Sequence, residues 1–164
     1  MAGRTVSRWV NFVIEDSAQT IRDIPINSIS MVGVVYEEQD LTAFQDLVKG
    51  ALPNMPDAPI EITGPWSTAA AQAASGSAVA PALSGSHTVL NDLPGAMLPL
   101  TLDVQFGDRA TYTDGAAQFG ISQSATSGYI CTSYTVNADD STYSARFVLF
   151  PGSALPAWGV AVEA

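Results

Sequence analysis

Apolar and polar residues alternate with a period of two along most of the chain, which is the pattern of half-buried β-strands. The clearest example is LTLDVQF, in which every second residue is apolar: Leu100, Leu102, Val104 and Phe106. The segments VNFVI, SMVGVVY and PIEIT are shorter runs of strand-forming residues. YICTSYTV and TYSARFVLF flank the polar turn NADDS, which predicts a β-hairpin. The pattern therefore predicts a mainly β protein.

One stretch, DLTAFQDLVKGAL, predicts a helix instead. Thr42 can cap its first turn, Gln45 follows three residues later, and Gly50 stands after the last turn. One apolar stripe would run along this helix: Phe44, Leu47 and Val48. We therefore expect a single short helix over residues 42–49 that packs on a sheet through this stripe.

Residues 66–99 have a different composition, rich in Ala, Ser, Gly and Pro, with Asp92 as their only acid and no Lys or Arg. A long segment of this kind inside a compact domain is usually functional or disordered. Its near absence of charge argues against a solvated linker. We expect an inserted arm that packs on a neighbouring subunit, and a mobile surface loop is the alternative. The candidate contact residues are Trp66, Val79 and Leu83.

Asp108 breaks the alternation, because counting by twos from Leu100 brings it onto the apolar face. A buried, unpaired carboxylate would be costly. A bulge at Gly107 could turn the side chain outward, or an arginine such as Arg146 could pair with it. The pattern does not decide between these two solutions.

The composition suits one domain of 164 residues, of which 47% are hydrophobic and only 13% charged. So few charges fit a chain that buries much of its surface against its own copies, or else a mildly apolar globular protein. With 16 acidic and 6 basic residues, the net charge of -10 disfavours specific DNA binding. DNA remains possible as a passing, non-specific neighbour. No run of about 18 apolar residues predicts a membrane span.

The sequence offers little catalytic or metal-binding chemistry. Cys131 is the single cysteine, lies in an apolar strand and is expected to be a buried packing residue. His87 is the single histidine and could in principle serve Ser84 or Ser86 as a base, but no nucleophile-elbow pattern frames these serines. One histidine and one cysteine do not make a transition-metal site. We therefore expect no catalytic residues, no metal and no cofactor.

The run INSISMVGVVYEEQDLTAFQD resembles the N-terminal half of the tail tube proteins of long-tailed bacteriophages. The matching pieces are Asp40, Thr42, Ala43, Phe44, Gly50 and the strand Ile60-Glu61-Ile62-Thr63-Gly64. In the C-terminal half, TLDVQFGDRATYTDGAAQFG, SGYICTSYTV and YSARFVLF are also similar to that family. The resemblance covers most of the chain except residues 66–99.

This resemblance implies a β-sandwich flanked by one short helix, with a long loop or arm that reaches an adjacent ring or subunit. It further implies homo-hexameric rings that stack into a tube, whose lumen conducts DNA, together with other tail proteins. The expected location is the virion tail, assembled in the cytoplasm of the bacterial host. Candidate acids for the lumen are Glu61, Asp103, Asp108 and Asp114.

Other classes of protein fit the same composition. A capsid decoration protein would also be small, acidic and β-rich, but it would form trimers or isolated knobs. A receptor-binding module of the tail tip would carry an aromatic-lined pocket. An enzyme built on His87 would lose its turnover when that histidine is replaced by alanine. The sequence does not show which acids face a lumen, whether a tail contracts, or whether the arm contacts its own ring or the next.

Overall fold

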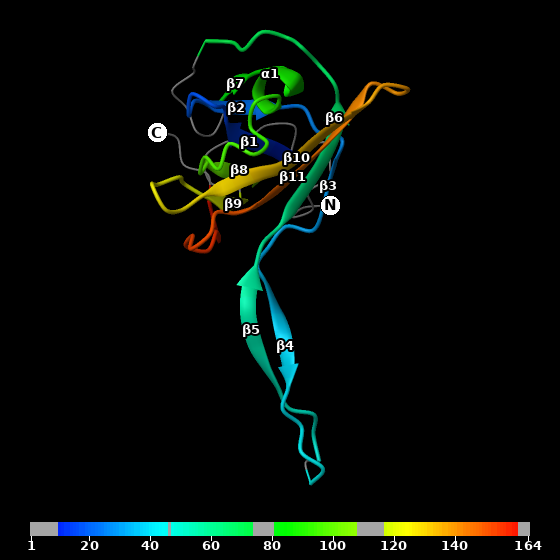
Figure 1. Cartoon of the computed structure of the whole chain (residues 1–164), viewed down its shortest axis with the longest axis vertical. Coiled ribbons are helices and arrows are strands. Elements are labelled where there is room, and N and C mark those ends of the chain that lie inside the picture. The colour runs from blue at the N-terminus through cyan, green and yellow to red at the C-terminus, as the bar shows by residue number, and fades with distance from the viewer. Residues whose placement is uncertain (1–9, 46, 74–80, 108–116, 161–164) are drawn as a thin grey trace.

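The computed structural model describes residues 10–45, 47–73, 81–107 and 117–160, and these residues form three sheets and one short helix. Two sheets pack face to face as a β-sandwich, and a long two-stranded hairpin projects from one end of it (Figure 1). The expected mainly β fold with one short helix is confirmed. Among the described residues, no helix is long and apolar enough to cross a membrane.

The first sheet has six strands in the order β12-β9-β8-β1-β2-β7. Its strands are β1 (Val10–Glu15), β2 (Ile21–Ile24), β7 (Ala82–Leu83), β8 (Leu102–Phe106), β9 (Ala117–Ile121) and β12 (Ala157–Val160). All neighbours are antiparallel except β2 and β7, which are parallel. We call it the six-stranded sheet.

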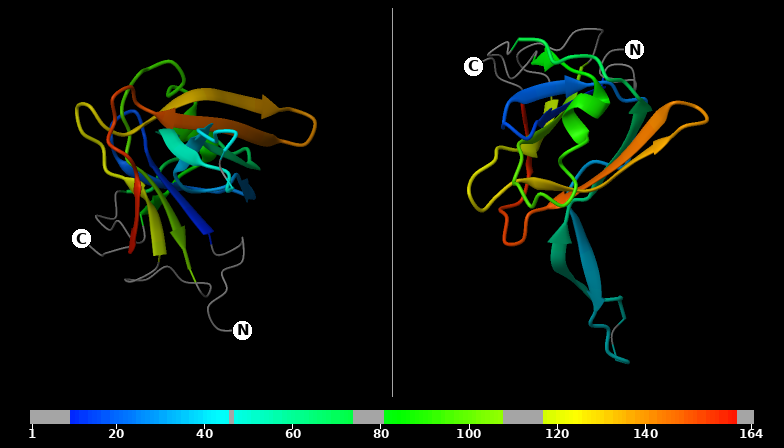
Figure 2. Two further views of the ribbon diagram at one scale, coloured as in Figure 1. Left: turned by 90° about the horizontal axis from the view of Figure 1, so that it is seen from below. Right: turned by 45° about the horizontal axis from the view of Figure 1, so that its top comes forward.

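The second sheet has four strands in the order β10-β11-β6-β3. They are β3 (Ser28–Ile29), β6 (Ile60–Pro65), β10 (Tyr129–Asn137) and β11 (Thr142–Leu149), all antiparallel to their neighbours. The turn NADDS joins β10 to β11, as the sequence predicts, and this turn extends beyond the sandwich (Figure 2). We call it the four-stranded sheet.

The core between the two sheets is built by the alternating apolar residues. Leu100, Leu102 and Val104 are buried on the face that the sequence pattern assigns to them, and Phe12 packs against Phe147 across the sheets with ring centroids 5.6 Å apart. Tyrosine hydroxyls at the core boundary find backbone acceptors: Tyr129 donates to the carbonyl of Ala58 at 2.9 Å. Burial of these alternating side chains specifies which face of each strand points inward.

The helix expected over residues 42–49 is not formed there. Residues 41–50 instead connect β4 (Val35–Asp40) to β5 (Ala51–Asp57), which pair as the projecting hairpin. The hydroxyl of Thr42 donates to the carbonyl of Gly50 at 3.2 Å and accepts from its N–H at 2.9 Å. The residue expected to cap a helix therefore closes a loop, because strand pairing on both sides brings Gly50 to it.

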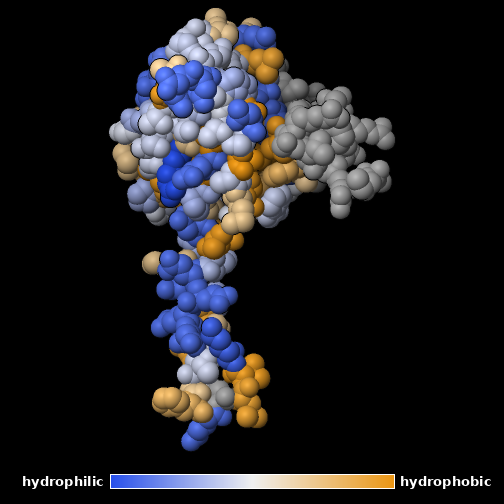
Figure 3. All heavy atoms as spheres, turned by 90° about the vertical axis from the view of Figure 1, so that its right-hand side faces the viewer, coloured by the Kyte–Doolittle hydropathy of each residue, from blue (hydrophilic) through white to orange (hydrophobic). Residues whose placement is uncertain are grey.

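The expected packing of the apolar stripe on the sandwich is wrong for the same reason. The side chains of Phe44, Leu47 and Val48 lie at the free end of the hairpin, 111%, 102% and 79% exposed. Figure 3 shows apolar side chains gathered at that end, far from the body of the molecule. No described part of the same chain covers them.

The short helix is α1 (Ser86–Leu90), inside the segment expected to be an arm. Val89, Leu90 and Leu93 belong to the core, and Ser86 Oγ donates to the carbonyl of Pro65 at 2.9 Å. This part of the segment is therefore tied into the sandwich, because β7 pairs with β2 and the side chains of Val89, Leu90 and Leu93 lie in the core, while Leu83 and Met97 are about half exposed. The element that projects is the β4–β5 hairpin.

Candidate assembly surfaces

The free end of the β4–β5 hairpin is the first candidate surface, and we call residues 42–50 the hairpin tip. Every residue of β4 and β5 is exposed, so the hairpin is covered by nothing that the structure describes. A two-stranded hairpin is marginally stable by itself in water. Exposed apolar groups of this size mark interaction sites. The hairpin tip therefore has the properties of a segment that is completed by another molecule.

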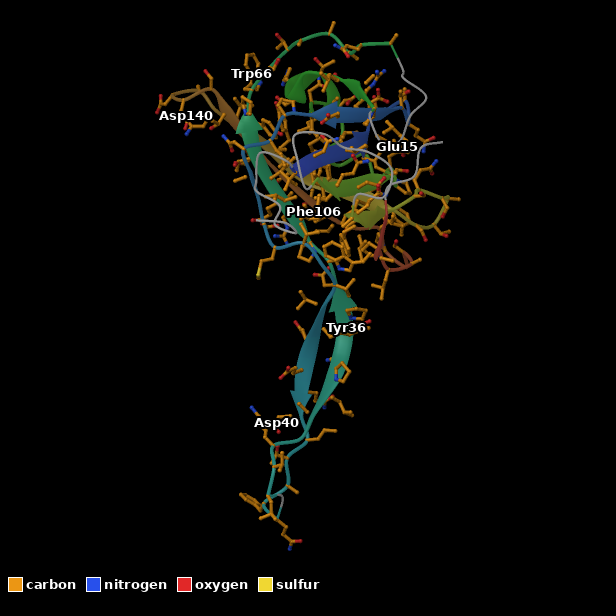
Figure 4. The ribbon with its side chains drawn as sticks, turned by 180° about the vertical axis from the view of Figure 1, so that it is seen from behind. Glu15, Tyr36, Asp40, Trp66, Phe106 and Asp140 are labelled. Carbon is orange, nitrogen blue, oxygen red and sulfur yellow. The ribbon has the colours of Figure 1, made fainter. Side chains whose placement is uncertain are left out.

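Charges are unevenly distributed along the hairpin. Its shaft carries the acids Glu37, Glu38 and Asp40, and the last of these caps the loop by accepting from the N–H of Thr42 at 2.9 Å. Hydrogen bonding from Thr42, first from its side chain and then from its backbone N–H, holds the pKa of Asp40 below its ordinary value. Lys49, the only lysine of the chain, lies at the tip and makes no ion pair in the part of the chain that the structure describes. Figure 4 shows Tyr36 and Asp40 at different heights along the shaft.

A pocket of about 530 Å³ lies beside β2 and β7. These two strands lie at the end of the molecule opposite to the hairpin (Figure 1). Its lining is mostly apolar or small: Val10, Asn11, Asp23, Ile24, Pro25, Ile26, Ser67, Ala69, Ala70, Gln72, Leu83, Ser84 and Gly85. Arg22 Nη1 donates to the carbonyl of Gln72 at 2.6 Å, and the N–H of Gln72 donates to the carbonyl of Leu83 at 3.0 Å. These bonds hold the two walls of the pocket together.

Two polar groups in this pocket are incompletely paired. The Ser84 hydroxyl is buried and has no hydrogen-bond partner among the described residues. Asp23 accepts from the Asn11 side-chain nitrogen at 2.6 and 2.8 Å, but no cation contacts it in the described chain. Burial raises the pKa of Asp23 to about 7, and the hydrogen bond from Asn11 offsets only part of that effect.

The outer face of the six-stranded sheet carries a second buried carboxylate. Asp23 and Asp103 lie opposite Val13 on its two neighbouring strands. Burial raises the pKa of Asp103 to about 6, while Gln118 Nε2 donates to it at 3.0 Å and lowers the pKa. A side chain at Gly120 would collide with the Asp103 carboxylate, so glycine there leaves room for it.

The outer face of the four-stranded sheet is more open. Glu61 on β6 forms an ion pair with Arg146 on β11, with Glu61 Oε1 and Arg146 Nη1 2.6 Å apart. The exposed residues around this pair are mainly hydroxyl-bearing, namely Thr132, Ser133, Thr135 and Ser144. The edge strands of this sheet are β3 and β10, each of which has a strand on only one side in the described chain.

The two candidate lumen acids that the structure describes, Glu61 and Asp103, lie on different surfaces. Glu61 lies on the outer face of the four-stranded sheet and Asp103 on the outer face of the six-stranded sheet, so the two point away from opposite sides of the sandwich. In a tube whose wall is one subunit thick, two acids on opposite faces of the sandwich cannot line the same channel. Asp108 and Asp114 lie outside the described residues, so the break in the alternation at Asp108 stays unexplained.

One candidate arm residue, Trp66, lies against His87. Trp66 follows directly after β6 and is 39% exposed (Figure 4). Its ring is tilted by 52° against the ring of His87, with ring centroids 5.4 Å apart. His87 Nδ1 is hydrogen-bonded to the Tyr134 hydroxyl at 2.9 Å. Leu83 is half-exposed at the pocket, and Val79 lies outside the described residues. Whether these residues contact a neighbouring subunit stays a prediction.

His87 and Ser86 are committed to structural contacts in this geometry. Ser86 Oγ donates to Pro65 and accepts from the N–H of Ser67 at 3.1 Å, and the histidine ring is held between Trp66 and Tyr134. Cys131 is buried, its Sγ donates to the carbonyl of Ser133, and burial raises its pKa to about 11. In the described chain, no group of three potential metal ligands comes together.

The sequence missed the hairpin and the pocket for different reasons. The hairpin is hidden because β5, ALPNMPD, contains two prolines, which usually argue against a strand and are tolerated here at an exposed edge. In the sequence, the signal for the hairpin is the acidic run of β4 followed by the two prolines of β5. The pocket joins residues of β1, β2 and the segment before α1, which are far apart in the sequence.

Comparisons with known proteins give structural matches only. No protein-family model matches the chain, and no curated protein matches its sequence. One structural match is a chain of an extracellular contractile injection system, the PVC sheath–tube complex in its extended state. It has a TM-score of 0.57 and 12% identity, over 98% of this chain and 93% of that one.

A second match is a chain of the anti-feeding prophage cap, described as a tube-terminating cap. It has a TM-score of 0.60 and 8% identity, over 98% of this chain and 94% of that one. Both matches span nearly the whole length of both chains. In fold, this chain is therefore similar to chains of contractile, tail-like injection machinery.

Proposed function

We propose that this protein is a tube subunit of a phage-tail-like apparatus, in which six copies form a ring and the rings stack into a tube. The observation that carries the proposal is the projecting hairpin with its uncovered apolar tip on a β-sandwich of tail-tube-like fold. A monomer gains nothing from a hairpin in which every residue of β4 and β5 is exposed, whereas a stacked assembly can bury it. The hairpin takes the role of the arm.

The four-stranded sheet is the better candidate for the wall of the lumen. Its outer face is exposed, rich in hydroxyl groups and nearly neutral, because Arg146 compensates Glu61. Its edge strands β3 and β10 each have a free side, so neighbouring copies can continue the sheet around a ring and remove the edges. Of the candidate acids, Glu61 is the one on this face.

The finer role is that of the major tail tube protein of a long-tailed phage, with DNA as a passing neighbour in the lumen. The net charge of -10 supports this, since it limits sticking of DNA to the wall. The subunit would work in the virion with other tail proteins, after assembly in the bacterial cytoplasm. Its role would be structural, with no catalytic step and no cofactor.

Negative-stain electron microscopy of the purified protein at high concentration tests this function. We expect rings or tubes with an open lumen and six-fold end views. The control is a variant whose residues 43–49 are replaced by a short glycine-containing turn. This variant should give no tubes, because it lacks the hairpin tip. Trimers or isolated monomers of the intact chain at high concentration would overturn the proposal in favour of a decoration or receptor-binding protein.

A further inference from the structure

We propose that the hairpin tip of one copy inserts into the pocket beside β2 and β7 of a second copy, where Lys49 of the first approaches Asp23 of the second. This inference rests on the proposed tube function and names the contact that joins successive rings. The occupant is a second copy of this chain. The pocket is not part of the hairpin, and no described segment of the same chain fills it.

Shape supports this pairing. The pocket volume of about 530 Å³ lies in the range of about 300–1,000 Å³ that encloses a small ligand. A cluster of three apolar side chains such as Phe44, Leu47 and Val48 is of that order of size. The walls offer matching apolar surface from Ile24, Pro25, Ile26, Leu83 and two alanines. Both partners therefore remove apolar surface from water when they meet.

Charge supports it as well. Lys49 has no ion-pair partner in the described chain, and Asp23 has a single neutral donor, the side chain of Asn11. An approaching ammonium group would compensate a carboxylate that burial otherwise destabilises. The buried Ser84 hydroxyl, which lacks a partner, could in addition pair with a backbone group of the incoming tip. Each unsatisfied group of the pocket thus has a counterpart on the tip.

The placement of the two surfaces determines the kind of assembly. The hairpin leaves the sandwich at one end and the pocket lies at the other (Figure 1). A contact between opposite ends of identical molecules is heterologous, and it repeats along one direction wherever its rotation does not close into a ring. Successive rings of a tube need a contact of this geometry. The β5 strand alone spans roughly 20 Å, which gives the tip the reach to enter a neighbour.

Cysteine cross-linking tests the contact directly. Lys49→Cys introduces a thiol at the tip, and Leu83→Cys introduces one at the pocket, next to Asp23 in the strand register. The native Cys131 is buried, so the unmodified chain serves as the background control. Under oxidising conditions, we expect the double variant to form a ladder of covalent dimers, trimers and longer chains. A mixture of the two single variants should give dimers only.

A matched control places the second thiol elsewhere. Val136→Cys is exposed on β10 and does not line the pocket, so its combination with Lys49→Cys should give no ladder. A ladder from this control that equals the ladder from Lys49→Cys with Leu83→Cys would overturn the assignment, because it would report random collision.

The charge pair has its own test through the protein concentration at which tubes first appear. We expect Lys49→Gln and Asp23→Asn each to raise this concentration several-fold to tenfold. Because the two residues are assigned to one contact, the double variant should be no worse than the poorer single variant. Additive effects of the two substitutions would contradict the pairing of Lys49 with Asp23.

Microscopy of the cross-linked samples separates failure of this inference from failure of the tube function. Tubes without a ladder would overturn the pocket as the receptor while leaving the tube function in place. Absence of both tubes and ladder would overturn both. A ladder without six-fold rings would support the contact between tip and pocket and overturn the hexameric ring.

Discussion

Thr42 and Gly50 hold each other through two hydrogen bonds across the hairpin tip, with the Thr42 hydroxyl donating at 3.2 Å and accepting at 2.9 Å. This pair closes the loop that presents Phe44, Leu47 and Val48 to solvent. The tip is therefore a defined turn and not an extended tail. Because its apolar residues are exposed, they contribute hardly anything to the stability of the single chain.

Leu47→Ala and Leu90→Ala should have opposite consequences, although both remove the same atoms. Leu90 is fully buried in α1, so its truncation should lower the free energy of unfolding by about 2–5 kcal/mol. Leu47 is fully exposed, so its truncation should change that free energy by no more than about 0.5 kcal/mol. Urea unfolding of the unassembled subunit measures both.

The assembly behaviour of the same two variants completes this comparison. Leu47→Ala should raise the concentration needed for tubes, because it removes apolar surface from the contact between subunits. A Leu47→Ala protein that unfolds as easily as Leu90→Ala would contradict the hairpin and restore a packed helix over residues 42–49.

The stability of the unassembled subunit should fall as the pH rises from about 4 to 7. Burial raises the pKa of Asp23 to about 7 and of Asp103 to about 6, above the value of about 4 in an unfolded chain. The folded state therefore binds more protons than the unfolded state within this interval, and stability decreases with pH. Above pH 7 the effect is complete, and below pH 4 it is absent.

Asp23→Asn should remove much of this pH dependence and stabilise the subunit at pH 8 by a few kcal/mol, given about 1.4 kcal/mol per pKa unit. Urea unfolding at pH 5 and pH 8 measures the difference. Glu61→Gln is the control, because Glu61 is exposed and its ion pair is solvated. An unchanged pH profile in Asp23→Asn would show that the carboxylate is not buried as described.

The ion pair between Glu61 and Arg146 should contribute little to stability. Its side chains are 58% and 44% exposed, and pairs of this kind contribute about 0–1 kcal/mol. Arg146→Ala should therefore lower the free energy of unfolding by less than about 1 kcal/mol. A loss above about 2 kcal/mol would indicate that the outer face of the four-stranded sheet is shielded in the single subunit.

The same face can be located in the tube by thiol labelling at Ser144→Cys, an exposed position beside Arg146 on β11. If this face lines the lumen, a small maleimide should label both subunits and tubes. A maleimide on a large dextran should label subunits only. As a control for the outer wall, Ser124→Cys lies in an exposed loop outside the four-stranded sheet. Equal labelling of Ser144→Cys tubes by both reagents would place the face outside.

Deleting residues 67–85 should prevent folding and not merely stacking. The N–H of Gln72 donates to the carbonyl of Leu83 within this segment. Its strand β7 pairs with β2 and so ties the segment to the sandwich. Replacing residues 43–49 by a short turn should, in contrast, leave the core intact. Circular dichroism and sedimentation of both deletions check this. A folded monomer from the deletion of residues 67–85 would restore that segment as a separate arm.

The sequence by itself determined strands such as β8, because the apolar alternation shows which of their faces points inward. It also determined the hairpin around NADDS. In these segments one face is buried, and a shift of one residue would expose every apolar side chain. The turn-forming residues of NADDS favour the same hairpin as the pairing of β10 with β11 on either side. The hairpin can therefore be predicted from this stretch of sequence alone.

Only the tertiary structure decided between helix and hairpin at residues 40–52 and placed the short helix at Ser86–Leu90. The groups that would cap a helix, Thr42 and Gly50, are equally satisfied across a loop once β4 and β5 pair. In α1, Val89 and Leu90 reach the core only because strands distant in sequence build a space for them. At α1, this long-range burial outweighs a local propensity of roughly a few tenths of a kcal/mol per residue, and it cannot be read from a short window of sequence. At the hairpin, whose strands are exposed, the pairing of β4 with β5 decides instead.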